Sequence, residues 1–158
     1  KHFPKLPGNV FVVPPESNIS TYVLSELCDS VIIYGTKTGV ELTSVGIPVI
    51  VAGEAWIRNK DLTTDATSPE SYRHILDSLP INARLDDATA IRARKYAYHF
   101  FFRRMIPVEI FEKGPGWPPY HFMGTLKDLT PGSDEGLDCI CEGIINGAPF
   151  VFDQATAP

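Results

Sequence analysis

The sequence predicts an α/β fold in which a doubly wound parallel sheet carries helices on both faces. Three short apolar runs, at residues 9–13, 31–34 and 48–53, predict strands. The runs are continuous rather than alternating, which is typical of strands that are buried on both faces. Segments with helical spacing separate the runs, and this order favours β-α-β-α-β connections between parallel strands.

The composition agrees with one folded domain. The 158 residues are 44% hydrophobic and 21% charged, which excludes disorder as the main state. The net charge of −5 excludes the basic surface of a typical nucleic-acid-binding domain, so we expect no nucleic-acid partner. Three cysteines do not suggest a disulfide framework, and reduced thiols indicate a cytoplasmic protein. Because the chain begins at Lys1 rather than at a methionine, we expect residues 1–158 to be a single domain from a longer, two-domain protein.

We expect the sheet to form a core within residues 9–80. The first apolar run ends at Pro14 and Pro15, because proline cannot continue the hydrogen bonds of a central strand. A short helix over residues 40–45 follows the second run, and Gly46 is suited to end it.

Two other helices of this core are predicted from their caps and their apolar spacing. The first is capped by Ser17 or Asn18, and its buried stripe consists of Ile19, Tyr22, Val23 and Leu27. The other begins at Ser68 with Pro69 in its first turn, and its stripe consists of Tyr72, Ile75, Leu76 and Leu79.

Residues 86–158 are expected to form a helical and loop region. A longer helix is predicted over residues 86–106, and Pro107 closes it. Residues 107–132 contain five prolines and four glycines, which predicts a long loop. A last helix is predicted over residues 134–145, ending at Asn146-Gly147.

Ligands bind open parallel sheets at the carboxyl ends of the strands, and the turns expected there span residues 14–20, 35–41 and 53–60. In the middle turn, Gly35 and Gly39 allow the backbone to approach a ligand closely, and Thr36 and Thr38 offer hydroxyl groups. The free N–H groups of the following helix suit a phosphate. Glu41, about half a turn into that helix, can accept hydrogen bonds from two sugar hydroxyls. The alternative is an ordinary strand-to-helix turn in which Glu41 complements the helix dipole.

Four motifs occur in a characteristic order: Pro14-Pro15-Glu16-Ser17, Cys28-Asp29, Gly35-Thr36-Lys37-Thr38-Gly39-Val40-Glu41 and Gly46-Ile47-Pro48-Val49-Ile50. In this order the motifs resemble those of bacterial capsule and surface polysaccharide biosynthesis proteins. More broadly, residues 9–53 look like the donor-binding half of GT-B glycosyltransferases. The similarity continues through residues 58–76, 95–107 and 134–150, and so covers nearly the whole chain.

The resemblance implies a Rossmann-like parallel sheet, the C-terminal half of a GT-B enzyme. It implies that the donor phosphate is held by Gly35, Thr36, Thr38 and Gly39. The donor hydroxyls would contact Glu41, and the nucleotide would be lined by Pro14, Pro15, Glu16 and Ser17. The implied reaction transfers a sugar from a nucleotide-activated donor to a glycan or a lipid-linked glycan acceptor, without a further cofactor. The acceptor half, usually N-terminal and often bearing the catalytic base, has no counterpart here, so we expect this fragment alone to be inactive.

Other residues carry weaker signals. Glu54, Arg58 and Lys60 are candidate donor contacts, or else belong to a solvated loop. Basic and aromatic residues alternate over residues 92–104, which suits either a peripheral contact with the inner membrane face or, as we favour, a core helix with a solvated charged side. Cys28 is expected to be a small core residue. The histidines share no ligand spacing and Cys139-Ile140-Cys141 is too closely spaced for a zinc site, so we expect no metal.

Two other functions remain open on the sequence. The first is a non-catalytic binding or assembly module of the polysaccharide machinery. The second is a half-domain like that of sugar-nucleotide epimerases, which share this architecture.

Overall fold

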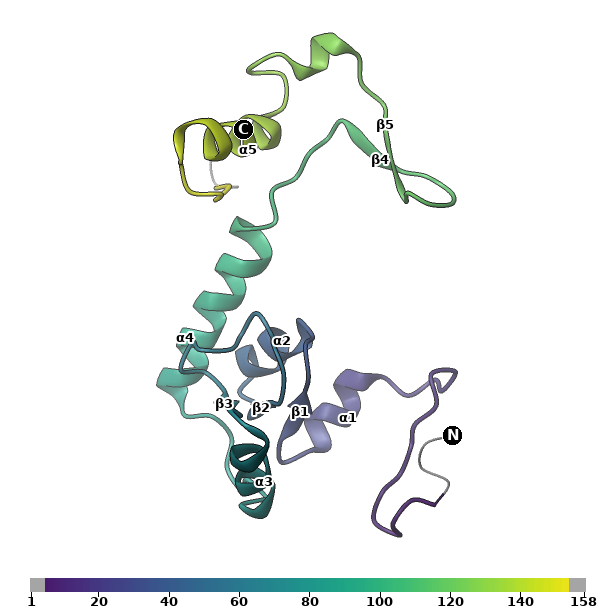
Figure 1. Cartoon of the computed structure of the whole chain (residues 1–158), viewed down its shortest axis with the longest axis vertical. Coiled ribbons are helices and arrows are strands. Elements are labelled where there is room, and N and C mark those ends of the chain that lie inside the picture. The colour runs from purple at the N-terminus through teal and green to yellow at the C-terminus, as the bar shows by residue number, and fades with distance from the viewer. Residues whose placement is uncertain (1–4, 154–158) are drawn as a thin grey trace.

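The computed structural model describes residues 5–153, so that His2 and the last five residues lie outside the description. Within residues 5–153 the chain is a mixed α/β structure with a three-stranded parallel sheet and a separate two-stranded antiparallel ribbon. Figure 1 shows an elongated molecule: the sheet and its helices lie at one end, and a long helix leads from them to the C-terminal region.

The parallel sheet has the strand order β1-β2-β3. Strand β1 (Val31–Ile33) pairs with β2 (Val49–Val51), which pairs in turn with β3 (Thr64–Asp65). The strands predicted at residues 31–34 and 48–53 are therefore confirmed. β3 was not expected, because two residues with exposed or half-buried side chains leave no apolar run to recognise.

The helix between β1 and β2 is also confirmed. It is α2 (Thr38–Ser44), and Gly46 follows it with a φ of 85°, a left-handed conformation that favours glycine. The region is very well packed, since Val40 and Leu42 of this helix are 0% and 2% exposed.

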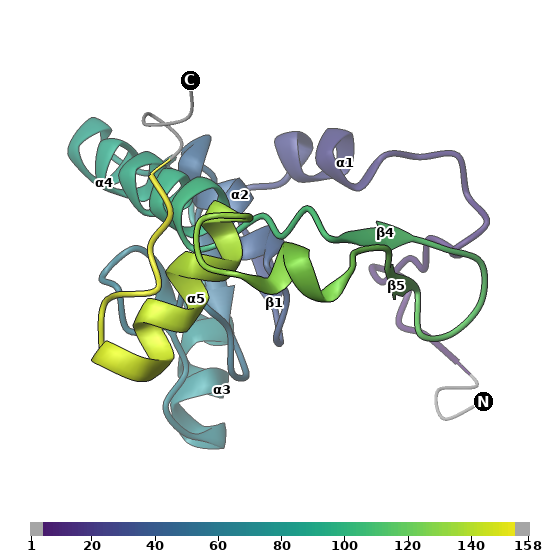
Figure 2. The same cartoon turned by 90° about the horizontal axis from the view of Figure 1, so that it is seen from above.

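The strand predicted at residues 9–13 is wrong. These residues form an extended segment that leads away from the sheet (Figures 1 and 2), and Phe11 and Val12 are 86% and 70% exposed. A β-branched run becomes a strand only where a neighbouring strand accepts its hydrogen bonds. Within the described residues, none of the strand pairings includes this segment.

Helix α1 (Thr21–Leu27) forms where it was predicted, but its N-cap position is Ser20, whose side chain makes no capping hydrogen bond. Its expected buried stripe is wrong as well, because every member is exposed: Ile19, Tyr22, Val23 and Leu27. The spacing identified the helix correctly, whereas the covering of its apolar side depends on a neighbour that the pattern does not specify.

The main core lies between the sheet and two helices. Side chains of β1 and β2 that point to one face meet α2 and the long helix α4 (Asp87–Tyr98), and both views place these two helices side by side (Figures 1 and 2). The cluster consists of Ile33, Val40, Leu42, Ile47, Val49, Val51, Ile57, Leu62 and Ala93. On the opposite face, Ile50 is fully buried but Ile32 is 41% exposed, so the cover there is partial.

The other two predicted helices of the first hundred residues are confirmed, with one difference. Helix α3 (Pro69–Asp77) begins at the Ser68 cap, and α4 begins at an Asp86 cap. Helix α4 continues into η1 (His99–Arg103), a π-helical turn in which the N–H of Arg104 bonds the carbonyl of His99 at 2.9 Å. The helix expected over residues 86–106 therefore widens at its end.

The loop expected over residues 107–132 contains regular structure. Strands β4 (Phe111–Lys113) and β5 (Tyr120–Phe122) form the antiparallel ribbon, and a 3₁₀ turn, η2 (Leu126–Leu129), follows. Helix α5 (Glu135–Asn146) confirms the last predicted helix, and Gly147 ends it with a φ of 70°. None of the helices within the described residues is long and apolar enough to span a lipid bilayer.

Candidate functional site

The carboxyl ends of the three parallel strands meet at a cleft of about 560 Å³. Each strand contributes to its lining: Tyr34 follows β1, Gly53 follows β2 and Ala66 follows β3. Thr67 and the start of α3 close another side. A parallel sheet presents its ligand-binding loops at this edge, so the cleft is a candidate site.

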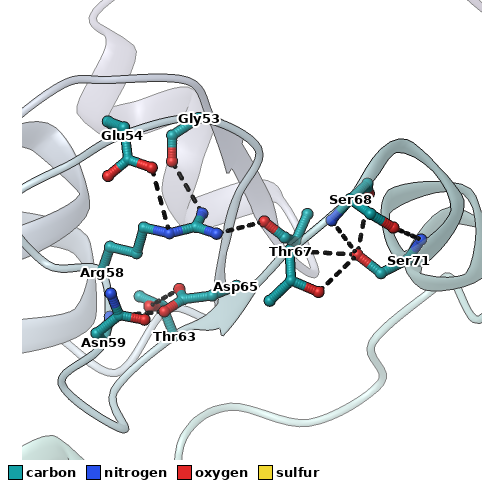
Figure 3. Close-up of polar contacts among 10 residues, drawn as sticks. Gly53, Glu54, Arg58, Asn59, Thr63, Asp65, Thr67, Ser68 and Ser71 are labelled. Atoms are coloured by element: carbon teal, nitrogen blue, oxygen red, sulfur yellow. Dashed lines mark hydrogen bonds and ion pairs between the residues drawn. The ribbon is translucent and has the colours of Figure 1, made fainter.

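Arg58 crosses this edge and joins two strand ends (Figure 3). Its guanidinium donates hydrogen bonds to the carbonyl oxygens of Gly53, at 2.9 Å, and Ala66, at 2.5 Å. Its Nε also lies 3.7 Å from a carboxylate oxygen of Glu54. The Arg58 side chain is 13% exposed and that of Glu54 is 92% exposed. Arg58 therefore lines the cleft but already holds two backbone carbonyls, and the exposed Glu54 carboxylate adds a negative charge to the same lining.

The loop that carries Arg58 is held by a second set of bonds. Asn59 and Asp61 have positive φ values of 58° and 54°, which bend the chain sharply between β2 and β3. The Asp65 carboxylate accepts hydrogen bonds from the Asn59 N–H at 2.7 Å and the Thr63 hydroxyl at 2.6 Å. Asn59 and Thr63 are thereby bonded to Asp65 of β3, as Figure 3 shows.

Hydroxyl groups at the start of α3 accept hydrogen bonds from backbone N–H groups of the same segment (Figure 3). The Ser71 hydroxyl oxygen accepts the N–H groups of Thr67 and Ser68 at 2.8 and 2.9 Å, and the Ser68 hydroxyl oxygen accepts the N–H of Ser71 at 3.1 Å. This capping box satisfies donors of the helix start within the protein.

The predicted phosphate loop touches the loop after β2. A Cβ atom added at Gly35 would lie 2.7 Å from the Glu54 carbonyl oxygen, so only glycine allows this approach. Next to this contact, the Thr36 and Thr38 hydroxyl oxygens lie 3.1 Å apart, and the Thr38 N–H bonds the Thr36 hydroxyl at 3.3 Å. The structure therefore sets Gly35 against Glu54 and brings Thr36 and Thr38 together, but none of Gly35, Thr36 and Thr38 lines the cleft at Arg58.

Gly39 has a different surrounding from the one expected. A Cβ atom added there would lie 2.5 Å from Cδ1 of Ile33 and 3.2 Å from Cγ2 of Ile57. Gly39 is buried, and its missing side chain lets α2 pack against the core. The sequence argument assigned this closeness to a ligand, but the atoms that approach Gly39 belong to the protein itself.

Glu41 lies in a separate cavity. Its carboxylate accepts a hydrogen bond from the Tyr22 hydroxyl at 2.8 Å, and this bond raises the pKa of Tyr22 above its ordinary value of 10.0. The cavity, of about 350 Å³, also contains Phe101 and Phe102 in its lining. Glu41 does not line the cleft at Arg58.

The predicted nucleotide turn, by contrast, lies on the extended N-terminal segment. The N–H of Ser17 bonds the carbonyl oxygen of Pro14 at 3.0 Å, which closes the turn that the sequence predicted. Pro14, Pro15 and Glu16 are exposed and Ser17 is half-buried. Both views place the segment before α1 away from the strand ends (Figures 1 and 2).

Lys60 lies on the other side of its loop from Arg58. It lines a cavity of about 430 Å³ with Trp56 and residues from the end of α4. Sequence reasoning missed Trp56, although the basic and aromatic run at residues 92–104 was noted, and this run supplies the facing side of the cavity. The two segments are about forty positions apart in the sequence and meet only in the folded structure.

Cys28 is exposed, and its thiol bonds the Leu24 carbonyl, so its assignment to the core is wrong. Cys28 follows Leu27, the last residue of α1, which is itself 81% exposed. Across residues 5–153, no group of three or more His, Cys, Asp or Glu side chains is arranged to hold a metal ion.

Comparisons with known proteins give no relative for this chain. No protein-family model matches it, and neither the curated proteins nor the solved structures contain a significant match.

Proposed function

We propose that this chain is the donor-binding domain of a glycosyltransferase that builds a capsular or surface polysaccharide from a nucleotide-activated sugar. In this proposal the parallel sheet is part of a Rossmann-like fold with helices on both faces, and a second half binds the glycan or lipid-linked acceptor. The enzyme works in the cytoplasm, at the inner face of the membrane.

One observation supports the proposal most directly. The turns after β1 and β2 are in contact through Gly35 and Glu54, at the edge where parallel sheets bind ligands. In the turn after β1, the hydroxyl oxygens of Thr36 and Thr38 lie 3.1 Å apart. A loop with two hydroxyls before a helix start is suited to a phosphate oxygen.

The chemical role of such a loop is electrostatic. When the sugar leaves the nucleotide, negative charge develops on the departing phosphate, and donors already in place stabilise it. Thr36 and Thr38 supply hydroxyl donors, while Arg58 supplies a positive charge whose position is fixed by Gly53 and Ala66. The acceptor is activated by the second half in this proposal.

Glu41 fits the proposal through its own cavity. A carboxylate accepts hydrogen bonds from sugar hydroxyls, and the rings of Phe101 and Phe102 offer apolar surfaces on which a sugar can lie. The bond from Tyr22 holds the carboxylate in position, at 2.8 Å from the phenol oxygen.

Thermal unfolding against a nucleotide panel tests the proposal. CMP, UDP, GDP, dTDP and their sugar conjugates are added to the chain, and we expect one base series to raise Tm progressively, with the logarithm of its concentration once this exceeds Kd. A double variant, Thr36→Val with Thr38→Val, removes both hydroxyls and keeps the side-chain shape. We expect it to weaken that binding by about tenfold or more, because each charged phosphate oxygen loses its donor.

Thr64→Val serves as the matched control, because Thr64 lies within β3, away from the loop. Loss of binding in this control as well would show a general effect on the fold. If none of the nucleotides raises Tm, the donor-binding proposal fails and the non-catalytic binding or assembly module is favoured.

A further inference from the structure

The cavity that contains Lys60 separates two segments far apart in the sequence. On one side lies the loop after β2, with Trp56 and Lys60, and on the other lies the end of α4 with η1. Its volume of about 430 Å³ falls in the range of small-molecule sites, which is about 300–1,000 Å³. It shares no lining residue with the cleft at Arg58.

Aromatic rings cover one part of this cavity. The ring of Trp56 lies 5.5 Å from that of Phe100, centre to centre, and Phe100 lies 6.2 Å from Tyr96 at an interplanar angle of 22°. Trp56 is 68% exposed, so its face is open to a ligand. The Tyr96 hydroxyl donates to the Trp56 carbonyl oxygen at 2.6 Å, which fixes the loop against the helix.

Basic side chains lie around the rings. Lys60 comes from the loop, and His99 and Arg104 come from the end of the helix. Among the lining residues that the structure describes, none carries a carboxylate, although the chain as a whole has a net charge of −5. Burial raises the pKa of Tyr96 and nearby Arg104 opposes this rise, which places the Arg104 charge close to the rings.

The widened turn η1 provides an independent observation. The N–H of Arg104 bonds the carbonyl of His99 rather than that of a residue four positions earlier. π-turns of this kind are rare and frequently occur at functional sites. Here the turn sets His99 and Arg104 on the same cavity.

We propose that this cavity binds a phosphate group carried on a ring, with the ring against Trp56 and Phe100 and the phosphate between Lys60 and Arg104. Nucleoside monophosphates and sugar phosphates share this chemistry. The site goes beyond the proposed donor loop, because none of the residues Gly35, Thr36 and Thr38 belongs to it.

Tryptophan fluorescence gives a direct readout of this site. The chain has two tryptophans, Trp56 and Trp117, and Trp117 is 91% exposed on the ribbon turn. The variant Trp117→Leu therefore leaves Trp56 as the single emitter. We titrate it with CMP, UMP, GMP, glucose 1-phosphate and inorganic phosphate. We expect a saturable change in emission with a ring phosphate and at least about tenfold weaker binding of inorganic phosphate.

Variants in the Trp117→Leu background test the phosphate contacts. Lys60→Gln and Arg104→Gln are expected to weaken the binding by about tenfold each, because each removes one charge that faces the phosphate. Lys113→Gln and Arg73→Gln are matched controls, since these exposed residues lie on the ribbon and on α3. Circular dichroism checks that each variant is folded.

The outcomes separate this site from the donor loop. If nucleoside phosphates bind more tightly than glucose 1-phosphate, the ring is a base; the opposite order identifies a sugar. The inference is overturned if none of the ring phosphates changes the emission, if inorganic phosphate binds equally well, or if the Lys60 and Arg104 variants bind as the controls do. Loss of binding in the Thr36 and Thr38 double variant, with binding kept in Lys60→Gln, would leave the donor proposal standing and refute this one.

Discussion

A guanidinium nitrogen of Arg58 lies 2.5 Å from the carbonyl oxygen of Ala66, and this bond fastens the loop after β2 to the end of β3. β3 is only two residues long and forms few ladder hydrogen bonds of its own. The same guanidinium bonds the Gly53 carbonyl oxygen at 2.9 Å. Arg58 therefore supplies cross-strand contacts that a longer strand would form through its backbone.

Replacement of Arg58 by methionine is expected to destabilise the chain. The change leaves two carbonyl groups without their charged donor, and we expect the free energy of unfolding to fall by about 2–4 kcal/mol. Arg58→Lys is expected to be nearly as damaging, because an ammonium group lacks the planar fork that bonds two carbonyls at once. Urea unfolding followed by circular dichroism measures both variants.

The matched control for Arg58→Lys is Arg73→Lys. Arg73 lies on α3 with a 71% exposed side chain, 3.8 Å from Glu70, and exposed pairs contribute little. Equal stability of the Arg58→Lys variant and the unmodified chain would contradict the role of the fork.

Gly39→Ala is expected to destabilise the chain although alanine favours helices more than glycine does. The new Cβ would meet Cδ1 of Ile33 at 2.5 Å and Cγ2 of Ile57 at 3.2 Å, inside the best-packed part of the core. We expect a loss of about 1–3 kcal/mol, as for other overpacked cores, in a urea titration. Gly8→Ala is the control, because nothing lies within 4 Å of its Cβ position. A stabilised Gly39→Ala variant would mean that α2 can shift away from the sheet.

The sequence predicted those elements whose signals are local. Ser68 with Pro69, and Gly147 after a helical run, determine their helix ends by capping chemistry that acts within a few residues. The continuous apolar strands at residues 31–33 and 49–51 were likewise recognisable, because runs without alternation are typical of parallel strands, although Ile32 of β1 is 41% exposed.

Features that depend on a partner were not predictable in this way. Residues 9–13 have the composition of a strand, but a strand also needs a neighbouring strand. Phe11 is 86% exposed, so nothing in the described residues covers it. Conversely, β3 has no apolar composition and forms because Arg58 and Asp65 hold its ends. The cavity at Trp56 brings together residues about forty positions apart, and no periodicity reveals such a meeting.

Phe11→Ser tests the claim that the N-terminal run contributes little to stability. The Phe11 side chain is 86% exposed, so its replacement removes almost no buried apolar surface, and we expect a change within about 0.5 kcal/mol. Ile33→Ala, at a position that is 6% exposed, is expected to cost about 2–5 kcal/mol. A large effect of Phe11→Ser on unfolding would indicate that residues 9–13 pack against the chain in solution.

The Tyr22–Glu41 bond makes stability depend on pH at the alkaline end. The hydrogen bond and the negative charge of Glu41 raise the pKa of Tyr22, so the folded chain holds this phenol proton more tightly than the unfolded chain does. The stabilising effect is complete below pH 10 and is lost as the pH rises through the raised pKa. Ultraviolet titration of the tyrosines is expected to lose a late component in Tyr22→Phe.

Glu41→Gln is the matched variant for that titration. It keeps an oxygen that can accept the hydrogen bond but removes the charge. The pKa of Tyr22 should therefore move back towards its ordinary value of 10.0. If Tyr22→Phe loses a component at the ordinary position rather than a late one, and Glu41→Gln leaves the titration unchanged, the two side chains do not meet in solution.

Asp134 joins α5 to the chain that follows α4, and its removal should uncouple the C-terminal region. Its side chain is 8% exposed: one carboxylate oxygen accepts the N–H of Leu137 at 2.8 Å as the helix cap, and the other accepts the N–H of Glu109 at 2.8 Å. Asp134→Ala leaves both N–H groups without this acceptor, and we expect a loss of about 2–4 kcal/mol in the free energy of unfolding. Asp134→Asn keeps one carbonyl oxygen, which can cap the helix but cannot serve both donors, so the loss of stability should be about half as large.

Hydrogen exchange separates the two contacts of Asp134: in Asp134→Asn the Glu109 amide should exchange faster while the Leu137 amide remains protected. If the Glu109 and Leu137 amides exchange in both variants as they do in the unmodified chain, the carboxylate does not bridge the two segments.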